Sequence, residues 1–214
     1  MDIGKNLGAS FDLYTKNFGI LFLAGLVVGL LSMVTLGILA GPLLGGFIVL
    51  CKKLLRGEKG EFNTVFAYVN QTGSLILLTV VMLVFAIITR IPVLGWLIGL
   101  IAGPVFGIMV TVVAGLAVEQ NKSVQEGLKF AWDKAKASFL QFWIYGFVFG
   151  LIGCIGAILG FVFGLIGGIG PILCGIGALL TMPIAMIGMV LAYQSITADS
   201  DAAVPPVDNV GPSI

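Results

Sequence analysis

The sequence predicts an all-α integral membrane protein with six transmembrane helices, arranged as three parallel-repeat helical hairpins that are each preceded by a cytoplasmic amphipathic helix. Three observations predict this fold. Of the 214 residues, 59% are hydrophobic and only 10% are charged, whereas a soluble domain has about a quarter charged residues. Three long apolar regions alternate with short charged segments. A polar segment with aromatic residues precedes each apolar region.

The composition also argues against several classes of protein. The net charge of +1 argues against nucleic acid as a partner, and the chain has no histidine. The three cysteines stand apart without a CxxC pair, which predicts neither a disulfide framework nor a metal site. We therefore expect no cofactor and no metal. The 31 glycines would be excessive in soluble helices but are common in membrane spans.

The first polar segment, Asp2 to Asn17, leads into the apolar region Phe18 to Cys51. This region is longer than the apolar core of a cleavable signal peptide, about 7–15 residues, so we expect it to stay in the mature protein. It is short for two spans unless Lys52 and Lys53 extend their ammonium groups to the interface. Its length also suits a re-entrant hairpin that returns without crossing.

The second polar segment, Glu61 to Gly73, is the weakest of the three copies, although Phe62, Phe66 and Val69 share one helical face. The apolar region that follows, Ser74 to Val118, is long enough for two spans of about 20 residues.

Arg90 is the only charged residue in this second apolar region. If the hairpin turns at Thr89 to Pro92, Arg90 lies at the far interface of the membrane. If it turns at Gly103 and Pro104, Arg90 lies inside a kinked span, where an arginine is costly and is a functional candidate by default. The closeness of Arg90 to Pro92 favours the turn.

The third polar segment, Ser123 to Phe139, predicts an amphipathic helix. Ser123 and Glu126 have the spacing of a capping box. Apolar residues recur at the helical period, at Val124, Leu128, Trp132, Ala135 and Phe139. A basic amphipathic helix with a Trp beside an apolar span indicates an interfacial helix; the alternative is a soluble helix docked on its own protein. We predict lipid-interface contacts for Trp132, Lys129, Lys134 and Lys136.

The apolar region after this helix, Ala137 to Ala198, has no charged residue and is long enough for two spans. The last residues, 199–214, hold three aspartates and three prolines. That composition predicts a disordered cytoplasmic tail.

Internal similarity predicts repeats. A shift of 121 residues carries Ile3 to Phe18 onto Val124 to Phe139 with the same apolar spacing, which is typical of a repeat. We expect one membrane domain, 1–198, with repeats at about 2–60, 61–122 and 123–198.

Glycines four residues apart recur in all three repeats: Gly37, Gly41 and Gly45; Gly95, Gly99, Gly103 and Gly107; and Gly156, Gly160, Gly164 and Gly168. This spacing allows helix backbones to approach closely, within one bundle or between copies of the chain. The alternative is a glycine-lined pore.

The distribution of charge predicts the topology. With six spans, ten of the eleven basic residues fall on one side of the membrane and only Arg90 on the other. The positive-inside rule then places both termini in the cytoplasm, with the protein in the plasma membrane. Three repeats that face the same way are related by an axis along the membrane normal.

Residues with catalytic chemistry are scarce. The acidic residues occur only in loops and at the termini, so we expect no paired carboxylates at membrane depth. Without histidine the commonest acid–base group is missing, and no Gly-Lys-Ser/Thr follows the glycines to form a phosphate loop. We therefore expect no enzymatic activity.

Three sequence features carry a resemblance to a known group: the polar-aromatic helix before a glycine-rich hairpin, Gly-Pro-Leu-Leu-Gly-Gly with the later Leu-Leu-Arg-Gly-Glu, and Ser-Val-Gln-Glu-Gly-Leu-Lys-Phe-Ala-Trp. Together they resemble prokaryotic multi-pass proteins related to the membrane domain found fused to glycerophosphodiester phosphodiesterases. The resemblance covers roughly residues 3–197. It implies a six-span helical membrane domain with no established activity. It carries over no catalytic residue, because the phosphodiesterase domain has no counterpart in this sequence.

We expect from these features a non-enzymatic multi-pass membrane module that binds lipid or a partner protein. The alternative is a transporter or channel for a lipid or a small apolar solute. The expected partners are membrane lipids, together with a second copy of the chain or another membrane protein.

Overall fold

The structure, a computed structural model, describes residues 2–35, 37–69, 72–167 and 170–201. These residues form helices and connecting turns, with no strand among them, in the order α1 (Ile3–Lys16), α2 (Phe18–Val34), α3 (Ala40–Leu55), the 3-10 helix η1 (Phe62–Phe66), α4 (Thr72–Ile88), α5 (Leu94–Glu119), α6 (Val124–Ala137), α7 (Phe139–Gly167) and α8 (Gly170–Asp201). A short helix followed by two longer ones occurs three times in this order. Each apolar region therefore holds two helices, and the all-α prediction is confirmed.

Helix α3 lies at the centre of the fold, where it contacts α2, α4, α5, α8 and η1. Most of its residues are buried, as expected for a helix that is apolar except for Lys52 and Lys53 in its last turns; its fully buried side chains are Leu43, Phe47, Ile48, Leu50 and Cys51. Glycines bring its neighbours close. A Cβ at Gly41 would lie 2.7 Å from the Leu75 carbonyl oxygen of α4, and one at Gly46 would overlap the Val65 carbonyl of η1.

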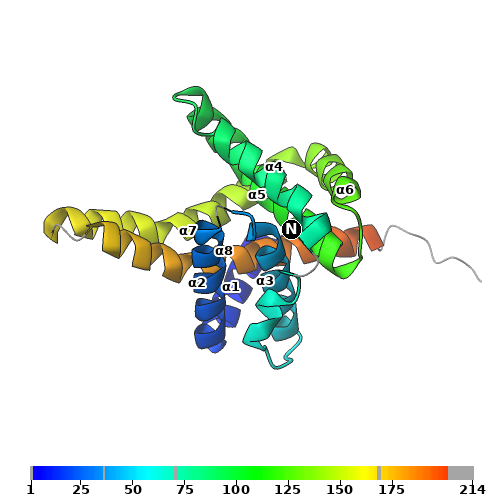
Figure 1. Cartoon of the computed structure of the whole chain (residues 1–214), viewed down its shortest axis with the longest axis horizontal. Helices are drawn as coiled ribbons and strands as arrows, with labels where there is room; N and C mark the ends of the chain where they lie inside the picture. Colours follow the sequence, from blue (N-terminus) through cyan, green and yellow to red (C-terminus); the bar gives the residue numbers. More distant parts are fainter. Residues whose placement is uncertain (1, 36, 70–71, 168–169, 202–214) are drawn as a thin grey trace, which may run out of the picture.

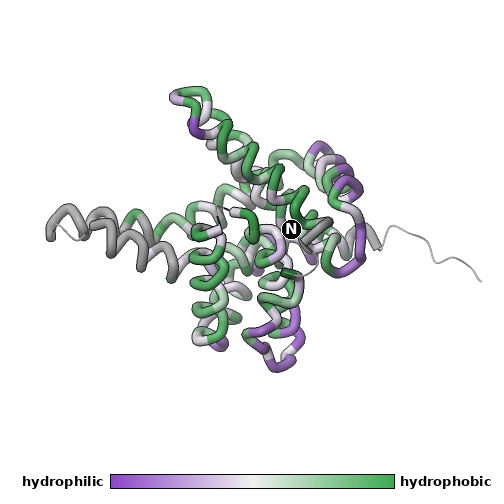
Figure 2. Tube along the Cα trace, in the orientation of Figure 1, coloured by the Kyte–Doolittle hydropathy of each residue, from purple (hydrophilic) through white to green (hydrophobic). Residues whose placement is uncertain are grey.

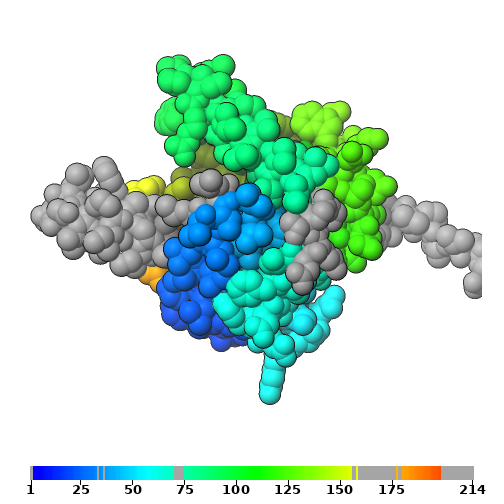
Figure 3. Space-filling model, viewed as in Figure 1, coloured from blue at the N-terminus to red at the C-terminus, as the bar shows by residue number. Residues whose placement is uncertain are grey.

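Three pairs of helices extend from this centre in different directions (Figure 1). In that view α4 and α5 point to the upper left, α7 and α8 to the left, and α2 and α3 downward. The outer part of the α4–α5 pair stands clear of the rest of the molecule (Figure 3) and is mostly apolar (Figure 2). The exposed side chains along α4 include Ile76, Val80, Val84 and Ile87. Apolar surface of this extent indicates contact with lipid or a partner.

Two of the short helices meet the following helix at nearly a right angle. The chain bends by 100° between α1 and α2 and by 103° between α6 and α7. Asp2 caps α1 by accepting from the amide of Lys5, and Ser123 caps α6 through the predicted capping box with Glu126. The two short helices are each 14 residues long and are followed by one non-helical residue, Asn17 or Ser138.

By length and composition, two helices of the described residues could each cross a membrane: Leu94–Glu119 and Leu180–Ala198. Four could do so if each bent pair counts as one span. The apolar part of α4, Leu75–Ile88, is shorter than these candidate spans. The apolar helices are thus compatible with a membrane protein of two to four spans.

One local expectation was wrong, and one helix ends later than the expected domain boundary. The second polar segment is not an amphipathic α-helix but the five-residue η1. Its Thr64 and Val65 are buried, with the Val65 carbonyl directly over Gly46 of α3, so packing rather than helical period decides its conformation. Helix α8 also runs to Asp201, past the expected domain end at residue 198. The rest of the expected tail, 202–214, lies outside the described residues.

The position of the second hairpin turn decides between the two placements of Arg90. Helix α4 ends at Ile88 and α5 begins at Leu94, with Pro104 inside α5. Arg90 therefore lies in the turn, and the kinked-span alternative is wrong. Gly95 closes this turn, because a Cβ there would lie 2.5 Å from the Thr89 carbonyl oxygen.

The surroundings of Gly46 and Gly103 predict opposite effects of the same substitution. Gly46→Ala should lower the free energy of unfolding by about 1–3 kcal/mol, because η1 must move away from α3 to admit the methyl group. Gly103→Ala should raise it by up to about 1 kcal/mol, since alanine favours a helix and no described atom lies within 4 Å of the added Cβ. Denaturant titration in detergent micelles would measure both; equal effects would contradict the packing described for α3.

Candidate functional site

Helix α6 docks on α5 through small residues. Val124, Gly127, Ala131 and Ala135 are buried, and a Cβ at Gly127 would lie 3.2 Å from a methyl group of Val113 on α5. The narrow face of α6 therefore packs on its own protein, as the alternative of a docked helix requires.

The outer face of α6 is aromatic and basic. Trp132 is 52% exposed, and Lys129 and Lys136 are exposed beside it. The Lys136 ammonium lies 5.2 Å from the centre of the Trp132 ring, within the range of a cation–π contact. The Lys134 ammonium lies 5.7 Å from the Phe130 ring. Figure 2 shows that hydrophilic residues gather on α6 and on the loop after α3.

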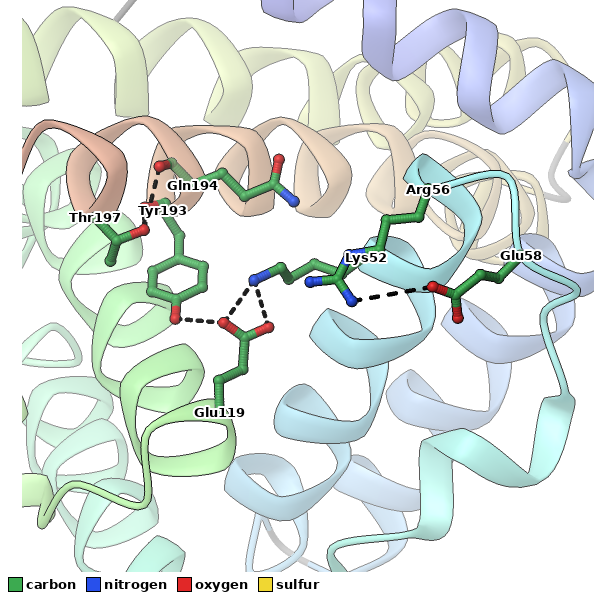
Figure 4. A network of polar contacts seen from close by, with 7 residues as sticks. All are labelled: Lys52, Arg56, Glu58, Glu119, Tyr193, Gln194 and Thr197. Atoms are coloured by element: carbon green, nitrogen blue, oxygen red, sulfur yellow. Dashed lines mark hydrogen bonds and ion pairs between the residues drawn. The ribbon is translucent and has the colours of Figure 1, made fainter. Parts of the chain in front are cut away.

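Three side chains from three helix pairs meet near the C-terminal ends of α3, α5 and α8 (Figure 4). The Lys52 ammonium lies 2.6 Å from both carboxylate oxygens of Glu119. The hydroxyl of Tyr193 donates to Glu119 at 2.7 Å, and the Lys52 ammonium is 5.4 Å from the Tyr193 ring centre. We refer to Lys52, Glu119 and Tyr193 as the Glu119 network.

The local structure holds this network in place. Lys52 is in the last turn of α3, where a cation is favoured by the helix dipole. A Cβ at Gly115 would lie 2.6 Å from the Tyr193 ring, so the glycine one turn before Glu119 makes room for that ring. The side chains of Lys52 and Glu119 are only 17% and 23% exposed, which strengthens their attraction relative to a surface pair.

The Glu119 carboxylate also interacts electrostatically with Tyr68, in the segment after η1. Burial raises the pKa of the Tyr68 hydroxyl above its usual range, and the Glu119 carboxylate raises it further. Tyr68 follows η1, so the segment between η1 and α4 also borders this network. The hydroxyl of Tyr68 stays neutral at physiological pH.

A second polar contact joins α1 to α7 and α8. The Asn6 side-chain amide of α1 donates to the Tyr145 hydroxyl of α7 at 2.9 Å, and that hydroxyl donates to the Gly188 carbonyl of α8 at 2.7 Å. Tyr145 is fully buried. Its phenol group is therefore a buried link between helices.

The predicted glycines have varied surroundings. Gly41 and Gly45 face α4 and α5 closely, with Gly45 meeting Val118, and Gly107 lies near Met189 of α8. Gly37 has a φ of +85° in the turn between α2 and α3, a conformation that favours glycine. The surroundings of Gly156, Gly160, Gly164 and Gly168 lie outside what the structure describes.

Gly99 and Gly103 do not bring helices together within the described part of the chain. A Cβ at Gly99 would touch only the Thr89 methyl group at 3.8 Å, and one at Gly103 would meet nothing within 4 Å. Instead, both line an apolar hollow of about 280 Å³ between α5 and α7, with Gly146, Gly150 and Met189 among its other walls. Close approach at this crossing occurs at Gly146, where a Cβ would overlap the Pro104 carbonyl.

The described residues offer no metal site, since no three His, Cys, Asp or Glu side chains among them are close enough to hold an ion. Cys51 is free and fully buried, out of reach of a modifying enzyme. The Glu119 network has hydrogen-bonding and ionic groups, but no described histidine or second carboxylate completes an acid–base pair there.

Glu119 and Tyr193 were not among the residues singled out from the sequence. Glu119 had one recognisable signal, because it is an acidic residue that directly follows an apolar region, as Asp199 also does. Its partner Lys52 similarly ends the first apolar region. No pattern in the sequence connects Tyr193 to them, since that contact depends on how α8 packs.

Comparison with known proteins found no match among family models, curated proteins or solved structures. The function is therefore argued from the geometry of this chain.

The Glu119 network should be coupled energetically. Lys52→Met or Glu119→Leu alone should lower the free energy of unfolding by about 1–3 kcal/mol, because each leaves a partly buried charge without its partner. The double variant should lose less than the sum of the two, since two apolar side chains can pack together. Denaturant titration of the four proteins in micelles would measure this coupling.

Lys53→Met is the matched control, because Lys53 is the adjacent residue on α3 and forms no ion pair among the described residues. It should change stability by less than either network variant. Additive losses in the double variant would show that Lys52 and Glu119 do not stabilise each other.

Proposed function

We propose that this chain is a non-enzymatic multi-pass membrane module that binds lipid through its interfacial helices. The observation that carries the proposal is the pair of right-angle bends, 100° after α1 and 103° after α6. An amphipathic helix at a right angle to an apolar helix can lie in the membrane surface while the apolar helix enters the bilayer. The exposed Trp132 and lysines of α6 suit the headgroup region.

The proposed topology has six spans in three repeats. The protein lies in the plasma membrane, with both termini in the cytoplasm. The equal lengths of α1 and α6 and their identical offset from the following helices support the repeats. The meeting of the ends of α3, α5 and α8 at the Glu119 network supports a return of each repeat to the same side. Six spans require a parallel arrangement of the three pairs, whereas the described pairs point in different directions (Figure 1).

The resemblance to the membrane domain of glycerophosphodiester phosphodiesterases stays a prediction. It agrees with this proposal, since it implies a six-span membrane domain. The oligomeric state and a protein partner likewise stay predictions, and the exposed apolar surface of α4 and α5 could be covered by either lipid or protein.

The basic face of α6 should give a preference for anionic lipid. Native mass spectrometry of the purified protein, incubated with equal amounts of phosphatidylglycerol and phosphatidylcholine, should show more phosphatidylglycerol bound. The triple variant Lys129→Gln/Lys134→Gln/Lys136→Gln should lose much of this preference, because each cation near an anionic surface contributes about 1 kcal/mol. The matched variant with three Arg substitutions should keep it. A preference that survives the loss of all three charges would contradict this role for α6.

A transporter for a lipid or small apolar solute is the second candidate. The hollow of about 280 Å³ between α5 and α7 favours it, because the glycines leave this apolar space open. Gly103→Leu would fill the hollow without meeting a described atom at its Cβ. If the protein moves fluorescent lipid between the leaflets of vesicles, this variant should slow the movement; the same slow rate in vesicles with and without protein would exclude the transport of lipid.

A further inference from the structure

The end of the α4–α5 pair combines a cation with exposed apolar side chains. We call residues 89–97 the α4–α5 tip. Trp96 and Val93 are each 77% exposed, Leu94 is 55% exposed, and Arg90 is exposed next to them. Water is a poor environment for a tryptophan and two aliphatic side chains exposed to this degree. The tip is therefore more stable in an environment that is apolar and that also offers acceptors for the hydrogen bonds of a guanidinium group.

Arg90 has no carboxylate partner among the described residues, and it is the only charged residue between Glu61 and Glu119. The tip also forms a hollow of about 540 Å³ whose walls include Thr89, Arg90, Trp96 and Leu97. A guanidinium group in such a place has five donors available for an anion, and its fork matches the oxygens of a phosphate.

The spacing along α5 fits the thickness of a bilayer. Residues 97–118 carry no charge and, at 1.5 Å per residue, extend about 33 Å. The hydrocarbon core of a bilayer is about 30 Å thick. The Glu119 network stands at one end of this stretch and Trp96 with Arg90 at the other, so the two polar ends of α5 are separated by about the distance between the two interfaces.

We propose that the α4–α5 tip binds the phosphate of a bilayer phospholipid, with the Arg90 guanidinium on the phosphate oxygens and the Trp96 ring at the boundary with the acyl chains. This inference rests on the proposed function, in which α5 crosses the membrane. It assigns a site at the interface opposite α6, where the exposed aliphatic residues of the tip contact lipid. The tip thus anchors the second helix pair at its far end, while the Glu119 network fixes its near end.

The depth of Trp96 tests this placement. In vesicles that contain phospholipid brominated either near the headgroup or near the end of the acyl chain, the fluorescence of a Trp132→Phe/Trp143→Phe protein reports on Trp96 alone. The shallow bromine should quench it more strongly than the deep one. A Trp96→Phe/Trp143→Phe protein reports on Trp132 and serves as the test of the proposed function itself.

The role of Arg90 is tested by substitution. With equal amounts of a phospholipid and an uncharged galactolipid, the ratio of bound phospholipid to galactolipid in native mass spectrometry should fall about fivefold in Arg90→Gln. Arg90→Lys should retain part of the ratio. Lys59→Gln removes the same charge from an exposed loop elsewhere in the molecule and should leave the ratio unchanged.

Each outcome has one meaning. If Trp132 is quenched and Trp96 is not, or if Arg90→Gln and Lys59→Gln give the same ratio, the tip site is wrong while the proposed function stands. If neither tryptophan is quenched, the proposed function fails as well. If a disulfide forms between two Trp96→Cys copies in the membrane and Trp96 is not quenched, a second copy of the chain covers the tip and the lipid site is overturned.

Discussion

The ion pair between Lys52 and Glu119, completed by the Tyr193 hydroxyl, is the contact on which the arrangement of the three helix pairs depends. Apolar packing alone is not directional, and among helices surrounded by lipid the hydrophobic effect no longer favours association. A carboxylate that accepts from an ammonium and a hydroxyl within 2.7 Å does have a preferred geometry. Because its three members come from α3, α5 and α8, this contact fixes the register of one helix from every pair.

The rest of the structure follows from that common point. Helix α3 is mostly buried and contacts α2, α4, α5, α8 and η1, with Gly41 and Gly46 allowing the backbones of α4 and η1 to approach it closely. Beyond the centre the pairs diverge (Figure 1), and the outer part of the α4–α5 pair exposes apolar side chains. The charged residues lie in the short helices, in the loops, near the C-terminal ends of α3, α5 and α8, and at one tip, and Figure 2 shows the most hydrophilic stretches on α6 and on the loop after α3. This division is the pattern that a bilayer imposes on a helical protein.

The sequence predicted the helices well, because apolar runs and cap residues act locally. The bounds of α1 and α6 and the capping box at Ser123 follow from residue spacing. Contacts between distant segments could not be predicted from the sequence. Gly99 and Gly103 have the same spacing as Gly41 and Gly45, yet only the latter pair faces a close neighbour, because helix crossing angles decide which glycines meet a backbone. For the same reason Tyr145 is a buried link, η1 is shaped by α3, and Tyr193 could not be joined to Glu119 before α8 was placed.

The central claim is that the α4–α5 pair lies across a bilayer between two anchored ends. Spin labels at Ile76, Val80, Val84 and Ile87, which share the exposed face of α4, test it directly in vesicles. The ratio of collisions with oxygen to collisions with a water-soluble nickel complex should be highest at Val80 and Val84 and should fall toward both ends, because oxygen concentrates in the hydrocarbon core. Equal access of the nickel complex at all four positions would contradict the account.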